Sequence, residues 1–424
     1  MAGTARVAPH NSPVNSTANP TARPSVPGLV GVALLGTKFM GRAHSNAWGA
    51  AGKFFDLPMP VSQEVVAGRD IAQTHAFAQR WGWRQATGDW RDAIEDPLVT
   101  LVDVVTPNNV HREQSIAALE AGRHVACEKP LAGTLAHARE MAAAARKAKK
   151  CRTFVWFNYR RCPAVSLAHQ LVAEGRLGRL FHVRATYLQD WGGPSTPLLW
   201  RFQANKAGSG AHGDLNAHII DMARFVTGLE FQEIVGAIEE TFVKEREVIE
   251  PAAAAPVLSP SGGKRRPGKL GKSTVDDAVL FLARFKGGAV GSFEASRLAT
   301  GNKNRNTIEV NGELGSVSFD FERMNELRWW DNTLPQRLRG WSTINCTEAV
   351  HPYAGSYWPS AHLIGYEHGF TSMAADIVKV LGGESPVVPL PDFEDALQTQ
   401  AVLEAALMAA RKRQPIRVRD VLKG

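Results

Sequence analysis

The chain has 424 residues, 44% of them hydrophobic, and a formal net charge of +8, and this length predicts two or three domains. No apolar run reaches the ~18 residues that a membrane-spanning helix needs. The four cysteines include no C-x-x-C pair, which argues against a zinc ribbon or a redox pair, and four in 424 residues do not form a disulfide framework. The positive charge gathers in short runs at 147–150, 263–272 and 411–419 without interleaved aromatic residues. We therefore expect no membrane and no nucleic-acid partner.

Residues 1–27 are rich in Ala, Pro, Ser, Thr and Asn, and they lack both an apolar core and a twin-arginine pair. A secretory signal is not expected from such a segment. We predict a flexible extension on a cytoplasmic protein.

From residue 28 onward, apolar strand patterns alternate with helix patterns. Strands are predicted over 29–36, 64–70, 99–107, 124–130 and 151–159, and helices over 42–51, 71–82, 109–122 and 134–150. Strands that alternate with short helices are typical of a doubly wound parallel sheet covered on both faces. We predict an α/β, Rossmann-type dinucleotide-binding domain over residues 28–156.

The pattern changes after this domain. Helices are predicted over 163–178 and 213–228, and strands over 179–191, 231–243, 276–298, 306–321 and 325–331. The segment 276–298 is a hairpin by its alternation and its Gly-rich turn. We predict a second, α+β domain over residues 157–424, with a large, mainly antiparallel open sheet and an exposed Pro/Gly/Lys-rich loop at 251–273.

The stretch GTKFMGRAH, residues 36–44, lies between the first strand and the first helix. This is the context in which a G-x-G-x-x-G loop binds a dinucleotide pyrophosphate. Gly36 permits the turn and Gly41 lets the helix pack closely, but Lys38 replaces the middle glycine. Its side chain could point away or meet a phosphate. We expect the loop residues at the cofactor to be Gly36, Lys38, Phe39, Met40 and Gly41; a turn without a ligand is the alternative.

The second predicted strand ends in Arg69 and Asp70, where an acidic residue normally binds the adenosine ribose. Arg69 could pair with a 2′-phosphate or stack on adenine. Asp70 could bind the ribose or cap the following helix. The choice between NAD and NADP is therefore open at this point.

Two further segments carry a family resemblance. Residues 105–141, VTPNNVHREQSIAALEAGRHVACEKPLAGTLAHAREM, resemble the Gfo/Idh/MocA oxidoreductases (glucose–fructose oxidoreductase, inositol dehydrogenase and MocA), whose T-P-N-x-x-H and E-K-P segments flank the nicotinamide. Residues 208–225, GSGAHGDLNAHIIDMARF, match the second signature, G-x-x-x-D-x-x-x-H-x-x-D. The resemblance implies that these residues lie at the cofactor: Thr106, Pro107, Asn108, His111, Glu128 and Lys129. His111 could alternatively cap the helix that follows.

Shorter segments, among them FNYRRCPAVSLAHQLVAEGRLG and HLIGYEHGF, resemble a subgroup that acts on sugars and glycosides, the levoglucosan dehydrogenases and glycoside 3-dehydrogenases. This resemblance implies oxidation of a ring secondary hydroxyl, C3 of a glucose-type pyranose, with NAD or NADP. It also implies a homodimer or homotetramer formed through the open sheet face. Two alternatives remain: redox-neutral glycoside cleavage with tightly bound NAD, and a dinucleotide-sensing regulator without catalysis.

Oxidation of a secondary alcohol needs a base for the hydroxyl proton and a group that stabilises the developing alkoxide. Lys129 can hydrogen-bond the reacting oxygen from the C-terminal edge of the first sheet. Asp214 and His218 are four residues apart, so on a helix they share one face. We predict His218 as the general base, because its ordinary pKa lies near neutrality, and Asp214 as an orienting or relay group. A metal held by Asp214, His218 and His212 is not expected.

A sugar site combines polar groups with aromatic faces. Side chains that flank the catalytic segment in the sequence could supply both, and our candidate substrate-binding residues besides His218 are Tyr159, Arg160, Trp191, Trp200, Arg201 and His362. Arg160 and His362 are the preferred candidates.

Overall fold

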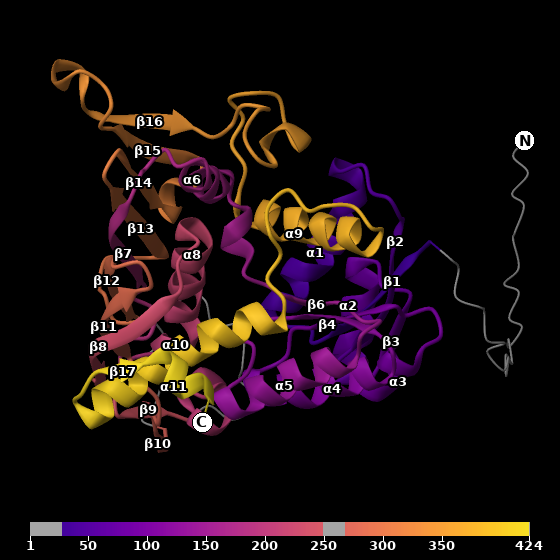
Figure 1. Ribbon diagram of the computed structural model, residues 1–424. Coiled ribbons are helices and arrows are strands. Elements are labelled where there is room, and N and C mark those ends of the chain that lie inside the picture. Colours follow the sequence, from indigo (N-terminus) through magenta and orange to yellow (C-terminus); the bar gives the residue numbers. More distant parts are fainter. Residues whose placement is uncertain (1–27, 249–267, 424) are drawn as a thin grey trace, which may run out of the picture.

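The computed structural model describes residues 28–248 and 268–423. Over these residues the chain forms two domains that lie side by side, each built on one sheet (Figure 1). The predicted extension, 1–27, and most of the predicted loop, 251–273, lie outside the described residues. The end of that loop is a correction, because Leu270–Lys272 forms strand β10, paired with β9 (Glu245–Glu247).

The first sheet has six parallel strands in the order β3-β2-β1-β4-β5-β6. Their bounds are β1 (Val30–Leu35), β2 (Val61–Ala67), β3 (Gln85–Thr87), β4 (Leu101–Val104), β5 (His124–Cys127) and β6 (Thr153–Val155). Strands β1 and β4 are buried at every residue, as their continuous apolar character predicts. The strand order reverses between β1 and β4, and ligands bind at the C-terminal ends of the strands flanking such a reversal.

Helices cover both faces of this sheet (Figure 1). One face carries α1 (Phe39–Phe54), α2 (Ile71–Trp81) and α9 (Tyr366–Leu381), and the other carries α3 (Trp90–Glu95), α4 (His111–Glu120) and α5 (Leu135–Lys147). Helix α9 comes from the far end of the chain and packs on α1. The amide of Val155 also donates to the carbonyl of Pro391 at 2.8 Å. Residues beyond 365 therefore help to build the first domain.

The second sheet has nine strands in the order β16-β15-β14-β13-β7-β12-β11-β8-β17, antiparallel except for the pair β7 and β12. Its bounds are β7 (Leu180–Leu188), β8 (Phe231–Glu240), β11 (Ala278–Phe285), β12 (Val290–Ser296), β13 (Arg305–Gly312), β14 (Gly315–Asp320), β15 (Glu326–Asp331), β16 (Trp341–Asn345) and β17 (Ile416–Arg417). The predicted fold class, a doubly wound parallel sheet followed by a mainly antiparallel one, is confirmed.

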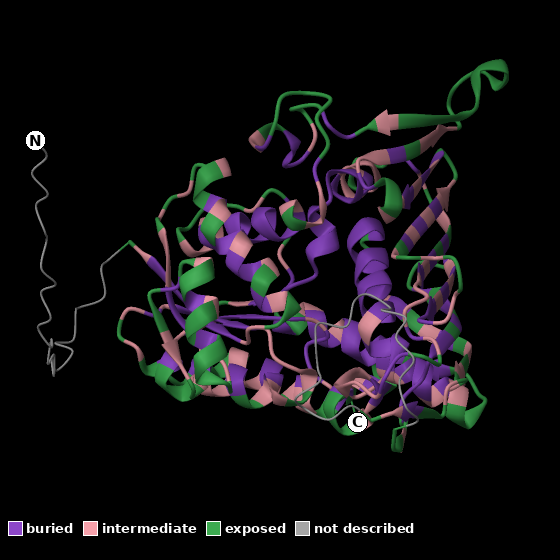
Figure 2. Ribbon diagram, turned by 180° about the vertical axis from the view of Figure 1, so that it is seen from behind, coloured by how far each residue is buried: buried purple, intermediate pink, exposed green. Residues whose placement is uncertain are grey.

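One face of this second sheet is covered by α6 (Pro163–Ala173), α8 (Ala217–Thr227) and α10 (Phe393–Lys412). Helix α8 is buried at every residue, and the sheet strands alternate between buried positions and intermediate or exposed ones (Figure 2). The opposite face therefore presents the outward residues of β8 and β11, and several of these are apolar: Val235, Ile238, Leu280 and Leu282.

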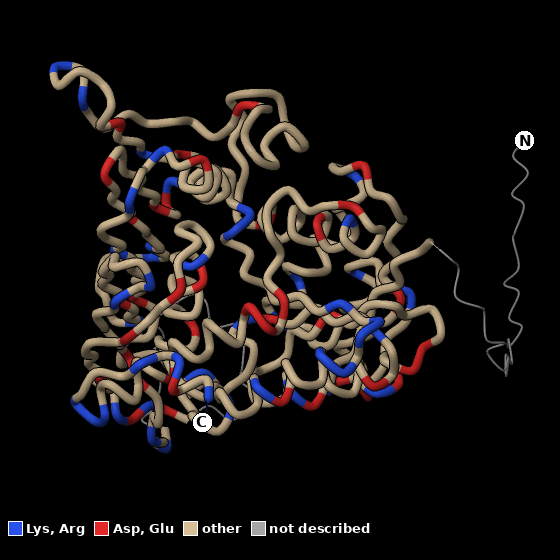
Figure 3. The backbone as a smooth tube through the Cα atoms, in the orientation of Figure 1, with Lys and Arg blue, Asp and Glu red and all other residues tan. Residues whose placement is uncertain are grey.

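Several elements were absent from the prediction, namely β3, α3, α7 (Ala204–Ala207), β9, β10, β16, α9, α10, β17 and α11 (Val418–Lys423). Among the described helices, none combines the length and apolar character needed to cross a bilayer. Basic and acidic residues are interspersed along the backbone of both domains (Figure 3).

Candidate active site

The loop between β1 and α1 requires glycine at two of the three positions of the G-x-G-x-x-G motif. Gly36 has φ of 120°, and a Cβ there would lie 3.0 Å from the carbonyl of Val105. A Cβ on Gly41 would lie 2.4 Å from the carbonyl of Gly36. Lys38, by contrast, has φ of −85° and an exposed side chain, so the middle position accepts a lysine without backbone strain.

The N-terminus of α1 fits a dinucleotide pyrophosphate. No side chain caps it, and its first turn contains no acidic residue, so its free amides and positive dipole end remain available to an anion. Phe39 is exposed at this end, and its ring stacks on Tyr366 at the start of α9, with centroids 6.2 Å apart. Met40 is half-buried against the core.

At the end of β2 the structure separates the two adjacent candidates. Asp70 caps α2: one carboxylate oxygen accepts from the amide of Gln73 at 3.1 Å and the other from its side-chain amide at 2.7 Å. The capping alternative is therefore observed, and a contact of Asp70 with the adenosine ribose stays a prediction. Arg69 is exposed, and its contact with the adenosine end of a cofactor stays a prediction.

The second loop predicted to bind the cofactor, residues 106–111, is held in place by hydrogen bonds from its own side chains. Thr106 donates to Gln114 at 2.6 Å, and Asn108 donates to the carbonyl of Ala207 at 2.9 Å, which links the two domains. Pro107 precedes the short 3₁₀-helix at Asn108–Val110. These three residues stay candidates for cofactor contact.

His111 requires a correction. Its ring is fully buried, with Nε2 2.9 Å from the carbonyl of Thr106 and Nδ1 3.2 Å from that of Pro130. It does not cap α4, and with no exposed surface its side chain has no face open to a cofactor. Burial lowers the pKa of His111, so the ring is neutral and holds the two loops together.

Lys129 and Asp214 meet across the domain junction. The Nζ of Lys129 donates to Asp214 Oδ1 at 2.7 Å and to the Asp214 carbonyl at 3.0 Å. The other carboxylate oxygen accepts from the buried Arg297 at 2.8 Å, and Arg201 Nε lies 3.9 Å away. Burial alone would raise the pKa of Asp214, but the three cations outweigh it and hold the pKa well below its ordinary value.

The backbone around Asp214 is not a regular α-helix. Residues His212–Asn216 form a π-helix that leads into α8, a feature frequent at functional sites. Asp276 caps its start by accepting from the amides of Gly210 at 2.7 Å and His212 at 2.8 Å. The ring of His212 is buried, 2.8 Å from the carbonyl of Leu403, and among the described residues no three potential ligands are grouped as a metal site.

His218 lies one turn further along, and its ring packs edge-on against Tyr159 with centroids 4.6 Å apart. Burial, with the charge of Lys129 added, lowers the pKa of His218 well below its ordinary value. The imidazole is therefore neutral and can accept a proton. Its Nδ1 is buried without a hydrogen-bond partner among the described residues, and such an orphaned polar atom calls for a functional explanation.

Aromatic and polar side chains surround these groups. The hydroxyls of Tyr159 and Tyr187 share a hydrogen bond of 2.6 Å, and Tyr187 donates to Asn304 at 2.8 Å. Trp191 donates to Gln189 at 2.6 Å, and its ring lies 5.1 Å from the guanidinium of Arg297. Half-exposed Arg201 stacks on Trp200 at 4.5 Å.

The preferred substrate candidates, Arg160 and His362, do not join this group. Arg160 is buried and pairs with Asp221 and Asp395, so it braces α8 against α10 and its assignment to the substrate is corrected. His362 is exposed in the loop before α9, with Nδ1 2.9 Å from the carbonyl of Pro359. Its substrate contact stays a prediction.

Four residues at the site escaped the sequence reasoning: His44, Asp103, Arg297 and Tyr366. His44 lies within the quoted glycine loop, and Tyr366 within the quoted segment HLIGYEHGF. Their side chains join the site through contacts between residues far apart in the chain, which no local pattern reveals. Nearby charges at Glu128 and Asp214 contribute to the raised pKa of Tyr366, after the larger effect of burial.

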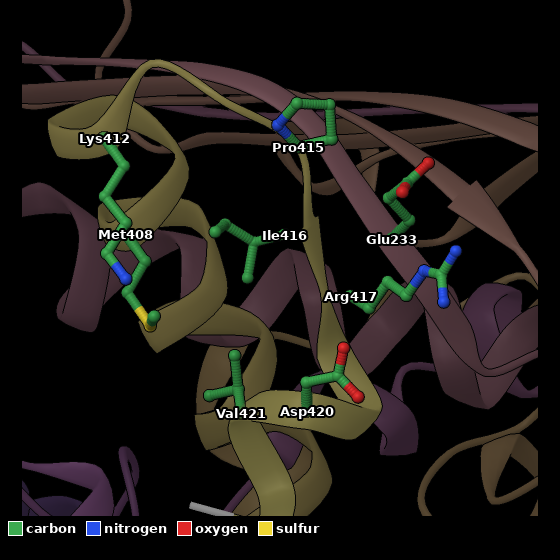
Figure 4. Close-up of a pocket in the computed structure, with 8 residues that line it drawn as sticks. All are labelled: Glu233, Met408, Lys412, Pro415, Ile416, Arg417, Asp420 and Val421. Atoms are coloured by element: carbon green, nitrogen blue, oxygen red, sulfur yellow. The ribbon is translucent and has the colours of Figure 1, made fainter.

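A separate hollow of about 400 Å³ lies between α10, α11 and β8 (Figure 4). It is lined by Glu233, Met408, Lys412, Pro415, Ile416, Arg417, Asp420 and Val421. None of the predicted site residues is among these, so the hollow is distinct from the Lys129–Asp214 junction.

Comparison with known proteins agrees with this geometry. An oxidoreductase-family model with an NAD-binding Rossmann fold matches residues 30–157, and a GFO/IDH/MocA C-terminal-domain model matches residues 165–318. The chain belongs to the Gfo/Idh/MocA oxidoreductases. The predicted family, oxidoreductase class and NAD cofactor are thereby confirmed.

Two curated relatives and two solved structures illustrate the similarity. Levoglucosan dehydrogenase from Pseudarthrobacter phenanthrenivorans is 41% identical over 384 residues, 90% of this chain and 96% of that protein. A levoglucosan dehydrogenase structure with NADH and levoglucosan has a TM-score of 0.84 at 39% identity, covering 92% of this chain and 99% of that one. An oxidoreductase domain protein from Kribbella flavida has a TM-score of 0.84 at 48% identity, with the same coverage. D-glucoside 3-dehydrogenase from Escherichia coli is 33% identical over 178 residues, 41% of this chain and 49% of that protein.

Proposed function

We propose that this Gfo/Idh/MocA protein oxidises a ring secondary hydroxyl of a glucose-type pyranose or glycoside, at C3, with NAD. The observation that carries the proposal is the Lys129–Asp214 contact beside a neutral His218. It joins a cation and a proton acceptor at the carboxyl edge of the Rossmann sheet, where the family binds its nicotinamide. The names of the similar proteins, levoglucosan dehydrogenase and D-glucoside 3-dehydrogenase, support the sugar and the carbon.

Each side chain has a distinct part in this chemistry. Lys129 donates a hydrogen bond to the reacting hydroxyl and its charge stabilises the alkoxide that develops. Neutral His218 accepts the hydroxyl proton. Asp214 fixes the ammonium of Lys129, and Arg297 fixes Asp214 from the opposite side. Bound NAD supplies the acceptor for the hydride from the carbinol carbon.

The test is absorbance of reduced nicotinamide with a panel of sugars, inositols and glycosides, run with NAD and NADP separately. We expect turnover with a pyranoside, loss of turnover in His218→Ala, and wild-type turnover in His75→Ala, an exposed histidine of α2. Deuterium at C3 of that substrate should slow kcat by a primary isotope effect. An effect from deuterium at another carbon would overturn the C3 assignment.

One further outcome is informative. Nucleotide that co-purifies, with glycoside cleavage and no net reduced cofactor, would replace net oxidation by the redox-neutral cycle.

For the choice of nucleotide, the exposed Arg69 supports acceptance of NADP beside NAD. Arg69→Ser should then lower kcat/KM for NADP and leave that for NAD within about twofold, because an exposed charge contributes little beyond its direct contact.

We also propose that two copies associate through the open face of the second sheet. Its outward side chains include exposed apolar residues on neighbouring strands, Ile238, Leu280 and Leu282, and patches of this kind mark protein interfaces. Light scattering should give at least a dimer, and Leu282→Glu should dissociate it. A monomeric wild-type protein at micromolar concentration would contradict this proposal.

A further inference from the structure

His44 joins the cofactor-binding helix to the catalytic segment. It lies on the buried face of α1, five residues after the exposed Phe39. Its ring is fully buried, with Nδ1 2.9 Å from Asp103 Oδ2 on β4 and Nε2 3.0 Å from Glu128 Oε1, directly after β5. Both ring nitrogens therefore face carboxylate oxygens from two different strands.

Asp103 has hydrogen-bond contacts at both of its carboxylate oxygens. Besides His44, it faces two indole donors, Trp48 Nε1 at 2.7 Å and Trp156 Nε1 at 2.9 Å. The ring of Trp156 also packs on His44, with centroids 4.1 Å apart, and Phe370 from α9 packs on it at 5.4 Å. An indole nitrogen can only donate, so Asp103 accepts two hydrogen bonds in an apolar surrounding before His44 is counted.

Glu128 is held at both of its carboxylate oxygens. Oε1 faces His44, and Oε2 accepts from the amide of Lys129 at 3.0 Å. The residue that follows Glu128 therefore has its backbone fixed by the same carboxylate that His44 contacts. Lys129 in turn places its ammonium on Asp214.

A neutral imidazole carries one N–H and one lone pair. In its neutral form, His44 would direct a lone pair at one of the two carboxylates, and two buried acceptors in contact are costly. The doubly protonated ring donates to both and places one positive charge between two negative ones. The contacts thus favour the imidazolium.

We propose that His44 is a positioning residue for the oxidation: as a buried imidazolium it clamps Glu128, holds the Lys129 segment at the reacting oxygen and couples it to α1. The inference rests on the proposed function for its kinetic part only. The charge state of His44 and the clamp on Glu128 do not depend on which alcohol is oxidised.

The groups around His44 set its pH range. Burial alone would lower the pKa of His44, but Asp103 and Glu128 raise it to about 9. These two carboxylates, from β4 and the residue after β5, are its charged neighbours among the described residues, and the rings packed on it are Trp156 and Phe370. The clamp is therefore closed at neutral pH and opens as the pH rises through about 9.

The decisive experiment is ¹⁵N NMR of the wild-type protein with labelled histidines, in the presence of NAD. His44 is assigned by its proximity to the ring of Trp156. We expect both ring nitrogens to carry protons from pH 6 to near pH 9. A ring with a single proton at pH 7 would overturn the charge assignment, whether or not any sugar is turned over.

Kinetics of His44→Gln test the positioning role. This variant keeps one donor but cannot bridge two carboxylates. We expect kcat to fall by about 10²-fold, the effect of a misplaced catalytic group, while the Kd for NAD stays within about threefold and the alkaline limb of the wild-type profile disappears. His75→Gln, at an exposed position of α2, is the matched control.

The outcomes separate the two proposals. An unchanged kcat and pH profile in a folded His44→Gln protein would overturn the positioning role. A wild-type protein that turns over no alcohol would refute the proposed function and leave the NMR result to decide the clamp. Should His44→Gln fail to fold, Glu128→Gln is the second variant, and it should remove one of the two ring protons from the NMR spectrum at pH 8.

Discussion

Two charged clusters meet at a single peptide bond, between Glu128 and Lys129, and they differ in charge balance and in access. The closed cluster consists of His44, Asp103 and Glu128, with one ring between two buried carboxylates. The open cluster consists of Lys129, Asp214, Arg201 and Arg297, with three cations around one carboxylate. In the open cluster the Lys129 and Asp214 side chains are 13% and 24% exposed.

The difference in charge balance and exposure gives each cluster a different role. In the closed cluster each carboxylate oxygen has a donor, and fully satisfied buried networks rigidify the segments they join. The open cluster has more positive than negative charge and faces the domain junction. Surplus cations in a partly desolvated site stabilise a developing alkoxide. The first cluster therefore holds geometry, and the second acts on the substrate.

The largest effect is expected where the open cluster loses its donor. Lys129→Met keeps the length of the side chain and removes the charge. We expect kcat to fall by about 10²–10³-fold, as for loss of one preorganised donor to a developing oxyanion. Lys206→Met, an exposed lysine of α7, is the control. A kcat within threefold of wild type would show that the open cluster does not act on the alkoxide.

The closed cluster should instead appear in the pH dependence of stability. The pKa of His44 is raised from 6.5 to about 9, so its contribution is complete below pH 6.5 and is lost as the pH rises through 9. The difference corresponds to about 3 kcal/mol of unfolding free energy. Urea denaturation of wild type and His44→Gln at pH 6.5 and pH 9 measures it. A wild-type slope equal to that of the variant would refute the charged clamp.

Arg297 tests whether the open cluster depends on geometry or on charge. Its two terminal nitrogens donate to Asp214 Oδ2 at 2.8 Å and to the carbonyl of Arg201 at 3.2 Å. Arg297→Lys keeps the charge but loses the planar guanidinium that reaches both acceptors, so we expect about a tenfold lower kcat. Arg297→Gln also removes a charge that lowers the pKa of Asp214. Its acidic limb in kcat/KM should therefore move to higher pH, whereas that of Arg297→Lys should not.

The two clusters also show which parts of the fold and of the site can be predicted from the sequence. The first sheet follows from local periodicity, and Lys129 and Asp214 follow from motifs contiguous in the chain. Arg297 joins Asp214 from 83 residues away, through the packing of β12 against the π-helix at His212–Asn216. The contact depends on strand order, which no local window contains. His44 lies in the glycine loop that the sequence singles out, but no local pattern predicts its contacts with Asp103 and Glu128.

The wrong assignments have the same origin. Arg160 and His111 stand next to catalytic motifs, and polar residues there resemble ligands in sequence. In the structure Arg160 pairs with Asp221 at 2.8 Å, and His111 faces three backbone carbonyls. Proximity in the chain does not tell whether a polar side chain turns toward the cleft or toward the core. Burial decides that, and it is a property of the whole fold.

The smallest effect is expected at Lys38, a cation outside both clusters. Its φ of −85° suits any L-residue, its side chain is exposed, and the uncapped amides of α1 are available to the pyrophosphate without it. Lys38→Ala should therefore weaken NADH binding by no more than about fivefold, the range of an exposed ion pair. The loss should vanish at high salt, where exposed charges are screened. Fluorescence titration at low salt and at high salt measures it. A loss of tenfold or more that persists at high salt would mean that the ammonium meets a phosphate directly, and that this loop has a charged contact in place of its missing glycine.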